Sequence, residues 1–246
     1  MSDKSICMLC KKEVGVESIV QGKALYQLKE HADQNGSMYG YCVDCVKGIL
    51  GKQTVESTMA AIPPHYRNLK YSDIKGQDKA ISRAKIYCEK DCSDWFILTG
   101  KSGNGKTMLS AVMAKHIAIK HCVSASWINI ANFNVDLRDM MRTNESEKAY
   151  INKLVKPDLL VIDDIGAGFG ESNYFTGTIY ALLNNRGDMD KRTIITTNMT
   201  ITDMADRLGT QIADRVIRSG EVVEMHGGSY SMRRPEQQAK GNSEQS

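Results

Sequence analysis

The sequence of 246 residues contains no long hydrophobic run. None of its segments approaches the roughly 18 consecutive apolar residues that a membrane-spanning helix needs. Its first residues, Met1 to Lys12, also lack the apolar core of a secretory signal peptide. These two absences argue against a membrane or secreted protein, and we expect the chain to be cytoplasmic, with no membrane partner.

A strong excess of charge of either sign is also missing. The 32 Lys and Arg residues and the 29 Asp and Glu residues leave a formal net charge of +3. Binding to nucleic acid through counterion release needs a local cluster of cations rather than a net excess. The charge balance alone therefore does not indicate a DNA-binding protein. Such a function has to be argued from particular sites.

A disulfide framework is not expected either, because the seven cysteines are an odd number and a reducing compartment disfavours disulfides. Four of them form two CxxC pairs, Cys7 with Cys10 and Cys42 with Cys45, separated by 31 residues. Each pair can direct two thiolates at one ion, and two pairs complete a tetrahedral zinc site. His31 lies between the pairs as an alternative ligand. The competing interpretation is that one pair is buried as small hydrophobic side chains.

The chain is predicted to contain a small module and one larger domain. Its composition, 41% hydrophobic and 25% charged, is that of an ordinary globular protein, and its length allows this division. We expect a zinc-binding module at residues 1–50 and a linker at 51–77, which is polar and contains two adjacent prolines. The main domain is expected at 78–232 and a disordered tail at 233–246.

Short apolar strands alternate with helices throughout the main domain, which predicts a parallel sheet covered by helices on both faces. The predicted helices are 79–89, 106–120, 134–142, 176–185 and 204–217, and the predicted strands are 95–99, 126–130, 159–163, 193–196 and 221–225. Three cysteines of this domain lack the CxxC arrangement and are predicted to pack rather than bind metal: Cys88, Cys92 and Cys122.

A nucleotide-binding motif follows the first of these strands. Residues 100–107 read Gly-Lys-Ser-Gly-Asn-Gly-Lys-Thr, a full match to the P-loop pattern GxxxxGK[ST] between a strand and a helix. The glycines let main-chain N–H groups turn toward phosphate oxygens, and the helix N-terminus adds partial positive charge. We predict that Lys106 reaches the β and γ phosphates and that Thr107 binds Mg²⁺. The predicted phosphate-binding residues are Gly100, Ser102, Gly103, Asn104, Gly105, Lys106 and Thr107.

An apolar strand that starts at Leu159 ends in two acids, Asp163 and Asp164. This is the form of a Walker B motif, in which Asp163 would hold Mg²⁺ and Asp164 would orient or deprotonate the attacking water. Many AAA+ ATPases carry Glu at the second position. Asp retains the charge but is one methylene shorter, which predicts slow hydrolysis and leaves open that hydrolysis is absent.

Two further positions match those of AAA+ ATPases. Asn198 follows the next strand, at the place of the sensor 1 residue, and its amide can bond both the γ-phosphate and the attacking water. Arg215 lies on the helix before the last strand, where an arginine finger would complete the site of a neighbouring subunit. Arg218 is the alternative for this role, and the other of the two would be an exposed helix cation. Hydrolysis is therefore predicted at subunit interfaces.

These residues together resemble the DnaC-type helicase loaders and their IstB-type transposition relatives among the AAA+ ATPases. The resemblance covers about residues 60–232. It includes the segments Ile62-Pro-Pro-His-Tyr-Arg67, Leu160-Val-Ile-Asp-Asp-Ile-Gly166, Thr196-Thr-Asn198 and Asp214-Arg215 ahead of Glu221-Val-Val-Glu224. It implies an α/β AAA+ P-loop NTPase fold with a stunted lid, and the 21 residues from His226 onward agree with such a lid.

The same resemblance implies a function in DNA replication. In this family, ATP-bound subunits bind single-stranded DNA, and the N-terminal region grips a hexameric replicative helicase. We therefore expect an ATP-dependent, DNA-stimulated loader that forms homo-oligomers in a bacterial or phage-infected cell. The implied DNA contacts are Ser172 and Tyr174, although Tyr174 could instead pack under a loop. Arg233 is the nearest candidate for sensor 2, and Arg138 and Arg142 could contact phosphates or remain solvated.

Two other functions stay open. The first is an IstB-like ATPase that assembles on duplex DNA and assists a transposase; the N-terminal cysteine pairs count against it, because those proteins generally lack such a module. The second is a zinc-dependent adaptor that binds helicase or DNA and uses ATP only as a conformational ligand, which Asp164 in place of Glu allows. ATP turnover with and without single-stranded DNA distinguishes this adaptor from the loader.

Overall fold

A computed structural model of the chain describes residues 4–6, 13–15, 43–143, 146–166 and 173–226, and the structural statements below concern these residues. Up to residue 51 only the course of the main chain is described. Two short strands there, β1 (Lys4–Ile6) and β2 (Glu13–Gly15), pair antiparallel. None of the helices in the described ranges is long and apolar enough to cross a membrane.

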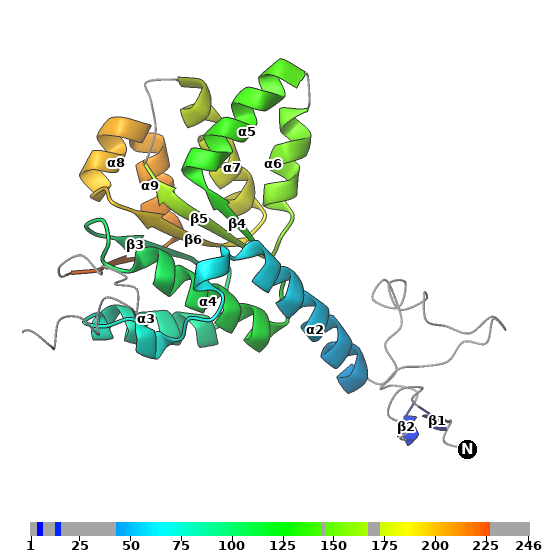
Figure 1. Cartoon of the computed structure of the whole chain (residues 1–246). Helices are drawn as coiled ribbons and strands as arrows, with labels where there is room; N and C mark the ends of the chain where they lie inside the picture. Colours follow the sequence, from blue (N-terminus) through cyan, green and yellow to red (C-terminus); the bar gives the residue numbers. More distant parts are fainter. Residues whose placement is uncertain (1–3, 7–12, 16–42, 144–145, 167–172, 227–246) are drawn as a thin grey trace, which may run out of the picture.

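A five-stranded parallel sheet forms the centre of the protein (Figure 1). Its strand order is β4-β5-β6-β3-β7. The strands are β3 (Trp95–Thr99), β4 (Ala125–Asn129), β5 (Leu159–Ile165), β6 (Arg192–Thr197) and β7 (Gly220–Glu224). Every residue of β3 and β6 is buried, as expected for parallel strands with helices on both faces. The predicted α/β class is confirmed.

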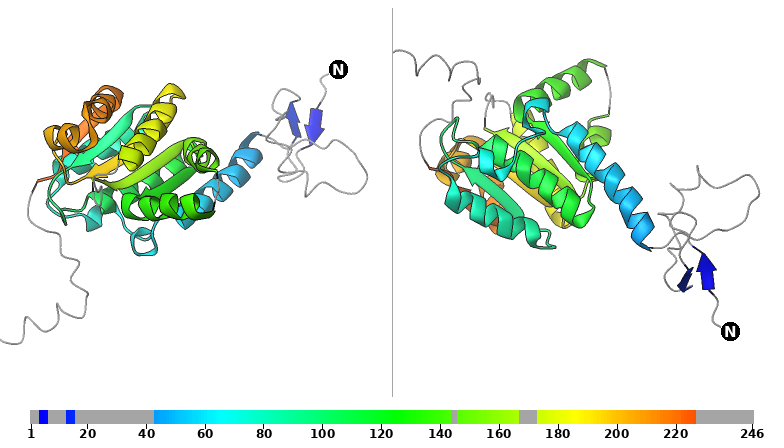
Figure 2. Two further views of the ribbon diagram at one scale, coloured as in Figure 1. Left: turned by 90° about the horizontal axis from the view of Figure 1, so that it is seen from above. Right: turned by 60° about the horizontal axis from the view of Figure 1, so that its bottom comes forward.

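Helices cover both faces of the sheet (Figure 1, Figure 2). Phe96 and Leu98 of β3 belong to a core with α3 and α4, whereas Ile97 belongs to a second core with the later helices. Because all strands are parallel, their carboxyl ends meet at one edge, where the P-loop follows β3. The helices are α3 (Asp78–Glu89), α4 (Lys106–His121), α5 (Ile130–Thr143), α6 (Glu147–Val155), α7 (Asn173–Asp188), α8 (Ile201–Leu208) and α9 (Thr210–Ser219).

Residues 51–77, predicted as a linker, are instead packed on the sheet domain. Helix α2 (Val43–Ala61) runs through the predicted boundary between module and linker and contacts α4 and β4. Thr58 is buried, and its Oγ1 accepts a hydrogen bond of 3.2 Å from the main-chain N of Ala125 at the outer edge of the sheet. Ile62 joins the core beside α3 and α4. Most side chains of this segment are polar and lie on its exposed face. The sequence pattern therefore gave no sign of the few side chains that are buried.

Two helical regions differ from those predicted. Helix α6 lies where the sequence predicted no helix, and it begins after Ser146, whose Oγ accepts a hydrogen bond of 3.2 Å from the N of Ala149. The single helix predicted at 204–217 is divided into α8 and α9 by Gly209, with φ 94° and ψ 150°. Glycine adopts this conformation at little cost, so a glycine within a helical pattern was the available signal.

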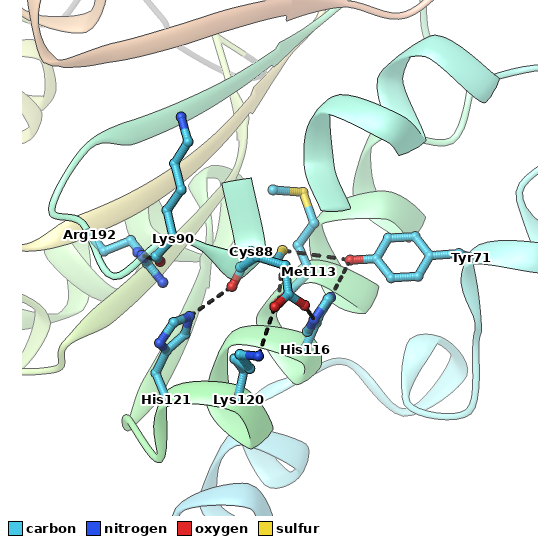
Figure 3. Close-up of polar contacts among 9 residues, drawn as sticks. Tyr71, Cys88, Lys90, Met113, His116, Lys120, His121 and Arg192 are labelled. Carbon is cyan, nitrogen blue, oxygen red and sulfur yellow. Dashed lines mark hydrogen bonds and ion pairs between the residues drawn. The ribbon is translucent and has the colours of Figure 1, made fainter. Parts of the chain in front are cut away.

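Polar contacts fasten the short turn η4 (Tyr71–Asp73) to helices α3 and α4 (Figure 3). Tyr71 Oη lies 3.0 Å from Nδ1 of His116 and donates a hydrogen bond to Sγ of Cys88 at 3.6 Å. Nε2 of His116 lies 2.9 Å from one carboxylate oxygen of Glu89, and Nζ of Lys120 lies 2.8 Å from the other. The segment after α2 is thereby tied to the helices that follow it.

The three cysteines of the main domain differ in burial. Cys88 is fully buried, as predicted, and burial raises the pKa of its thiol to about 12, so the thiol stays protonated. Cys92 is half-buried, and its Sγ lies 3.4 Å from Nη2 of Arg192. The packing prediction is wrong for Cys122, which is exposed and ends α4 in a left-handed conformation, with φ 52°.

Candidate nucleotide-binding site

The P-loop between β3 and α4 depends on its glycines for its shape. Gly100, Gly103 and Gly105 have positive φ angles of 131°, 79° and 95°. A Cβ at Gly100 would lie 2.3 Å from the carbonyl oxygen of Met225, so no other residue fits there. The buried Asn104 donates a hydrogen bond of 2.6 Å to the same oxygen. The loop is therefore fixed to the end of β7.

Lys106, the first residue of α4, is buried at the carboxyl edge of the sheet with an exposed fraction of 6%. Its Nζ donates to the carbonyl oxygens of Gly100 and Lys101 at 2.7 and 2.9 Å, and to Oδ1 of Asn198 at 2.7 Å. Desolvation lowers the pKa of Lys106, while the carboxylates at the end of β5 oppose this shift. The cation is held between the P-loop and the end of β6.

Asp163 accepts hydrogen bonds from three different elements. Its Oδ1 accepts from Thr107 Oγ1 of α4 at 2.9 Å and from Thr196 Oγ1 of β6 at 2.8 Å. Its Oδ2 accepts from Nδ2 of Asn129, at the end of β4, at 3.3 Å. The structure thus brings together Thr107 and Asp163, the two residues predicted to bind Mg²⁺. Hydroxyl and carboxylate oxygens are the ligands that this ion prefers, so the pair fits it.

Asp164 has an unusual main chain, with φ 62°. The pairing of β5 with β6 shifts in register between Ile162 and Ile165, on either side of the two acids. The main-chain N of Asp164 donates 2.8 Å to Oγ1 of Thr196, and its Oδ1 accepts 3.0 Å from Nδ2 of Asn198. Asn198 therefore contacts both Asp164 and the P-loop lysine.

The pKa of the Asp164 carboxyl is raised, first by desolvation and then by repulsion from Asp163, while Lys106 lowers it. A carboxylate in such a place binds a proton more readily than an ordinary Asp. That property suits a group that accepts a proton from water.

These side chains line one cleft of about 350 Å³ at the carboxyl edge of the sheet. The predicted residues on its wall are Ser102, Gly103, Gly105, Lys106, Thr107, Asp163, Asp164 and Asn198. Gly100 and Asn104 do not line it and instead fix the shape of the loop. The glycine turns, the buried cation and the adjacent oxygen ligands fit the phosphates of a nucleotide with Mg²⁺.

Four residues of the cleft were not predicted from the sequence: Tyr66, Met108, Asn129 and Thr196. Asn129 and Thr196 lie at the carboxyl ends of strands, so the strand pattern could have indicated them. Tyr66 belongs to the turn η3 (Pro64–Tyr66), within the segment predicted as a linker. Burial raises the pKa of Tyr66, and the charge of Asp163 adds to this shift.

The two candidate finger arginines on α9 have different surroundings. Nη2 of Arg215 donates to the carbonyl oxygen of Asn184 at 2.9 Å and pairs with Oδ1 of Asp188 at 2.7 Å, both on α7 of its own chain. The guanidinium lies over Gly187, where a Cβ would approach Nη2 to 2.2 Å. Arg218 is exposed. Arg215 would therefore have to leave these contacts in order to reach a neighbouring subunit.

The predicted DNA contacts are only partly described. Tyr174, at the start of α7, is half-buried, and its Oη donates 2.6 Å to Oε2 of Glu147, which raises the pKa of Tyr174 to about 12. Arg138 lies 6.0 Å from the centre of the Phe175 ring. Arg142 is exposed, 3.6 Å from Asp139. Ser172 and the sensor 2 candidate, Arg233, lie outside the described residues, as does the predicted tail at 233–246.

The predicted zinc ligands also fall outside the described side chains. Cys7, Cys10, Cys42 and the alternative ligand His31 lie in ranges that the structure does not describe. Cys45 lies on α2, where only the main chain is described. Within the described part of the chain, no group of three or more His, Cys, Asp or Glu side chains could hold a metal ion.

Comparison with known proteins gives a consistent set of relatives. Residues 52–239 match the family model of IstB-like ATP binding proteins. The replicative helicase loader DnaC of Escherichia coli (strain K12) is 30% identical over 164 residues, which are 64% of this chain and 66% of that protein. The uncharacterized protein YdaV of the same strain is 25% identical over 168 residues, 65% of this chain and 66% of that protein. The match thus spans slightly less than two thirds of these relatives.

Solved structures share the architecture of the sheet domain. The crystal structure of the DnaC helicase loader has a TM-score of 0.56 at 21% identity, covering 61% of this chain and 89% of that one. The crystal structure of DnaI has a TM-score of 0.54 at 21% identity, covering 73% and 93%. The replication initiator DnaA, bound to AMPPCP and single-stranded DNA, has a TM-score of 0.57 at 18% identity, covering 68% and 51%. At these identities the likeness concerns the fold.

Proposed function

This chain belongs to the family of IstB-like ATP binding proteins, and from that premise we propose that it is an ATPase that loads a replicative DNA helicase onto single-stranded DNA. The observation that carries the ATPase proposal is the cleft in which Lys106, Asp163, Asp164 and Asn198 meet. The 30% identity to the E. coli loader DnaC supports the choice of helicase loading as the process.

Five residues of the cleft have roles in the proposed hydrolysis. Lys106 binds the β and γ phosphates, exchanging its present acceptors for phosphate oxygens. Thr107 and Asp163 would hold Mg²⁺, which when bound would neutralise charge on the phosphates. Asp164 orients the attacking water and takes its proton, and Asn198 keeps the carboxylate of Asp164 in position through its amide. Because Asp is shorter than Glu, we expect slow turnover that DNA binding accelerates.

Assembly completes the proposed site. We retain Arg215 as the arginine that acts on a neighbouring subunit, in a homo-oligomer formed on ATP and single-stranded DNA. Its ion pair within the chain is with Asp188, whose side chain is 71% exposed, and exposed pairs contribute only about 0 to 1 kcal/mol. Exchange of this ion pair on assembly therefore costs little, and Arg215 would also exchange its hydrogen bond to the carbonyl oxygen of Asn184. Arg218 is the alternative, and Ser172 and Tyr174 are retained as proposed DNA contacts.

The N-terminal region is proposed to bind the helicase through a zinc-stabilised module. One zinc ion would be held by Cys7, Cys10, Cys42 and Cys45, and chelation should unfold the module without melting the ATPase domain. Metal analysis of protein purified without chelator tests this, and finding no bound zinc would contradict it.

The partner would be the hexameric helicase of a bacterial cytoplasm, and capture of purified replicative helicase by the full-length chain is the direct test.

The decisive measurement for the whole proposal is helicase loading. Full-length protein, ATP and single-stranded DNA circles coated with single-strand-binding protein are mixed with purified replicative helicase, and DNA-bound helicase is counted. We expect loading by the wild type and none by Lys106→Ala. Loading that is equal with and without this chain would refute the proposal.

The name of the matching family favours one second candidate, an IstB-like ATPase that assists a transposase. Stimulation of ATP turnover by duplex DNA rather than by single-stranded DNA would support that function. Strong nucleotide binding with no turnover on either DNA, combined with helicase capture, would support the adaptor, in which ATP is only a conformational ligand.

A further inference from the structure

Thr196 is the residue that connects the two acids of the proposed active site. It lies on β6, is 1% exposed, and uses its hydroxyl twice. Oγ1 donates a hydrogen bond of 2.8 Å to Oδ1 of Asp163 and accepts one of 2.8 Å from the main-chain N of Asp164. A hydroxyl carries one proton and two lone pairs, so it can serve a carboxylate and an N–H at the same time.

The strand pairing explains why one threonine meets two acids. Ile162 pairs with Ile195, and the next pair is Ile165 with Thr197. Two residues of β5, Asp163 and Asp164, therefore lie opposite a single residue of β6, Thr196. This is the arrangement of a β-bulge, in which two residues of one strand oppose one of its neighbour.

The bulge determines where the second acid points. In a regular strand, successive side chains point to opposite faces, so Asp163 and Asp164 would be separated by the sheet. Here both line the same cleft. Asp164 reaches it through a left-handed main chain with φ 62°, a conformation that non-glycine residues seldom adopt. Such a conformation persists only where the surroundings hold it.

We infer that Thr196 is a positioning residue for ATP hydrolysis, which holds the bulge that brings Asp164 into the cleft beside Asp163. The inference rests on the proposed ATPase function. Without the hydroxyl, the N–H of Asp164 loses the acceptor that the structure gives it on β6. Asp163 keeps the hydrogen bond from Thr107. The loss therefore falls on the placement of Asp164, which acts in hydrolysis, and not on Lys106, which binds nucleotide.

The chain offers a matched control in the next residue. Thr197 is also on β6 and is 0% exposed. Its hydroxyl donates 2.7 Å to the carbonyl oxygen of Ile165 and accepts 3.1 Å from the N of Met199, so it touches neither acid. Replacing either threonine by valine removes one buried hydroxyl and keeps the shape. Thr196→Ser is the conservative variant, because it keeps the hydroxyl and removes only a methyl group.

The test compares full-length variants for ATP turnover on single-stranded DNA and for the affinity of a fluorescent ATP analogue. In Thr196→Val, kcat should fall roughly 10- to 100-fold while affinity stays within about threefold. Thr196→Ser and Thr197→Val should stay within about threefold of wild type in both measurements. Three results would overturn the inference: a kcat of Thr196→Val equal to that of wild type, a loss of kcat in Thr197→Val as large as in Thr196→Val, or a loss of nucleotide affinity in Thr196→Val as large as its loss of kcat. If the valine variant does not fold, Thr196→Ser is compared with Thr196→Ala, and turnover that does not differ between these two overturns it as well.

Hydrogen–deuterium exchange of the segment 159–166 gives a reading that does not need turnover. The N–H of Asp164 should exchange faster in Thr196→Val than in wild type, and it should be unchanged in Thr197→Val. If wild type hydrolyses no ATP, the proposed ATPase fails, and unchanged exchange in Thr196→Val is then the separate result that removes the role of Thr196.

Discussion

The two ends of the central sheet hold buried cations in different ways. At the carboxyl end, Lys106 shares its donors between main-chain carbonyls and the side chain of Asn198, which is itself exposed. At the amino end, Arg186 is 0% exposed and bonds four carbonyl oxygens and one hydroxyl, those of Leu154, Val155, Pro157, Arg192 and Thr193. Burial lowers the pKa of Arg186 to about 10, which leaves it charged at neutral pH.

The difference distinguishes the proposed nucleotide-binding site from a contact that only stabilises the fold. The acceptors around Arg186 include the last carbonyls of α6, which have no partner inside the helix, so the guanidinium closes that helix and joins it to β6. The guanidinium is 0% exposed and faces main-chain carbonyls, so it offers no open side to a ligand. Arg192, which lies beside Lys90 in Figure 3, likewise bonds main-chain carbonyl oxygens, those of Lys90 and Cys92 just after α3. Lys106, by contrast, opens onto a cleft and can exchange an amide for a phosphate.

The largest expected effect is on stability, at the amino end. Arg186→Met should lower the free energy of unfolding by about 3 to 5 kcal/mol, because four buried carbonyl oxygens lose their donor. Urea denaturation followed by circular dichroism measures this. Arg83→Met is the control, since its side chain is 61% exposed and its ion pair is with Glu221 at the surface, and it should cost less than about 1 kcal/mol. Equal stability of the two variants would remove the structural role of Arg186.

The next effect is on binding, at the carboxyl end. Lys106→Ala should weaken ATP binding roughly 100-fold, since a charge-assisted contact to the phosphates is lost, while unfolding free energy changes much less than in Arg186→Met. Titration with a fluorescent ATP analogue, paired with urea denaturation, separates the two quantities. Lys101→Ala is the control, because that side chain is exposed and only its main-chain oxygen contacts Lys106. Unchanged affinity in Lys106→Ala would refute the P-loop assignment.

The sequence predicted the carboxyl end better than the amino end, for a physical reason. A P-loop and two acids after a strand constrain residue types at fixed spacing, so Lys106, Asp163 and Asn198 could be assigned from the pattern. The partners of Arg186 are main-chain carbonyls, which every residue carries, and no pattern marks them. Thr196 is an intermediate case. Its place at a strand end was visible, but the bulge opposite it depends on register between strands distant in sequence.

The fold was predictable to a similar extent. Strong apolar strands and the long helix after the P-loop are local features and were predicted within a few residues. The packing of 51–77 depends on a few buried side chains such as Ile62 and Thr58 within a polar segment. The end of α8 depends on the conformation of the single residue Gly209. Tertiary contacts and one dihedral angle determine these features, so the periodicity of apolar residues in the sequence does not reveal them.

A smaller effect concerns pH and again contrasts the two ends. Desolvation and repulsion from Asp163 raise the pKa of Asp164, so turnover should begin to fall at a higher pH than for an ordinary Asp, about tenfold per unit below that pKa. At the amino end, burial raises the pKa of Asp158, but the pair with Lys191 and the hydrogen bonds from Ser124 together outweigh burial and lower it. Asp158 therefore contributes stability that is lost only as pH falls through that lowered pKa.

A kcat profile against pH, with analogue affinity and circular dichroism recorded over the same range, separates chemistry from binding and unfolding. An acid limb at or below the ordinary Asp pKa of about 3.9 would contradict the role of Asp164 as proton acceptor.

The smallest expected signal is a partial rescue, which tests whether Arg215 acts across subunits. Arg215→Ala should bind ATP almost normally, because Lys106 and Thr107 of the same chain still hold the phosphates, and only hydrolysis should fall. When Arg215→Ala and Lys106→Ala proteins are mixed in equal amounts, about a quarter of randomly formed interfaces pair an intact P-loop with an intact finger. Activity should therefore return in part, and it should grow with protein concentration and with the length of single-stranded DNA.

Two controls decide what a failed rescue means, since Arg215 also has contacts in its own chain. Asp188→Ala removes the ion pair but keeps the arginine, so it should hydrolyse ATP at least as well as wild type if the pair merely holds Arg215 back. If Asp188→Ala and Arg215→Ala lose activity and stability together, the pair is structural. The same mixing experiment with Arg218→Ala then becomes the test, because that side chain is exposed and its removal should leave the fold unchanged. Rescue by neither arginine variant, under conditions in which wild type turns over, would show that the site is complete within one chain.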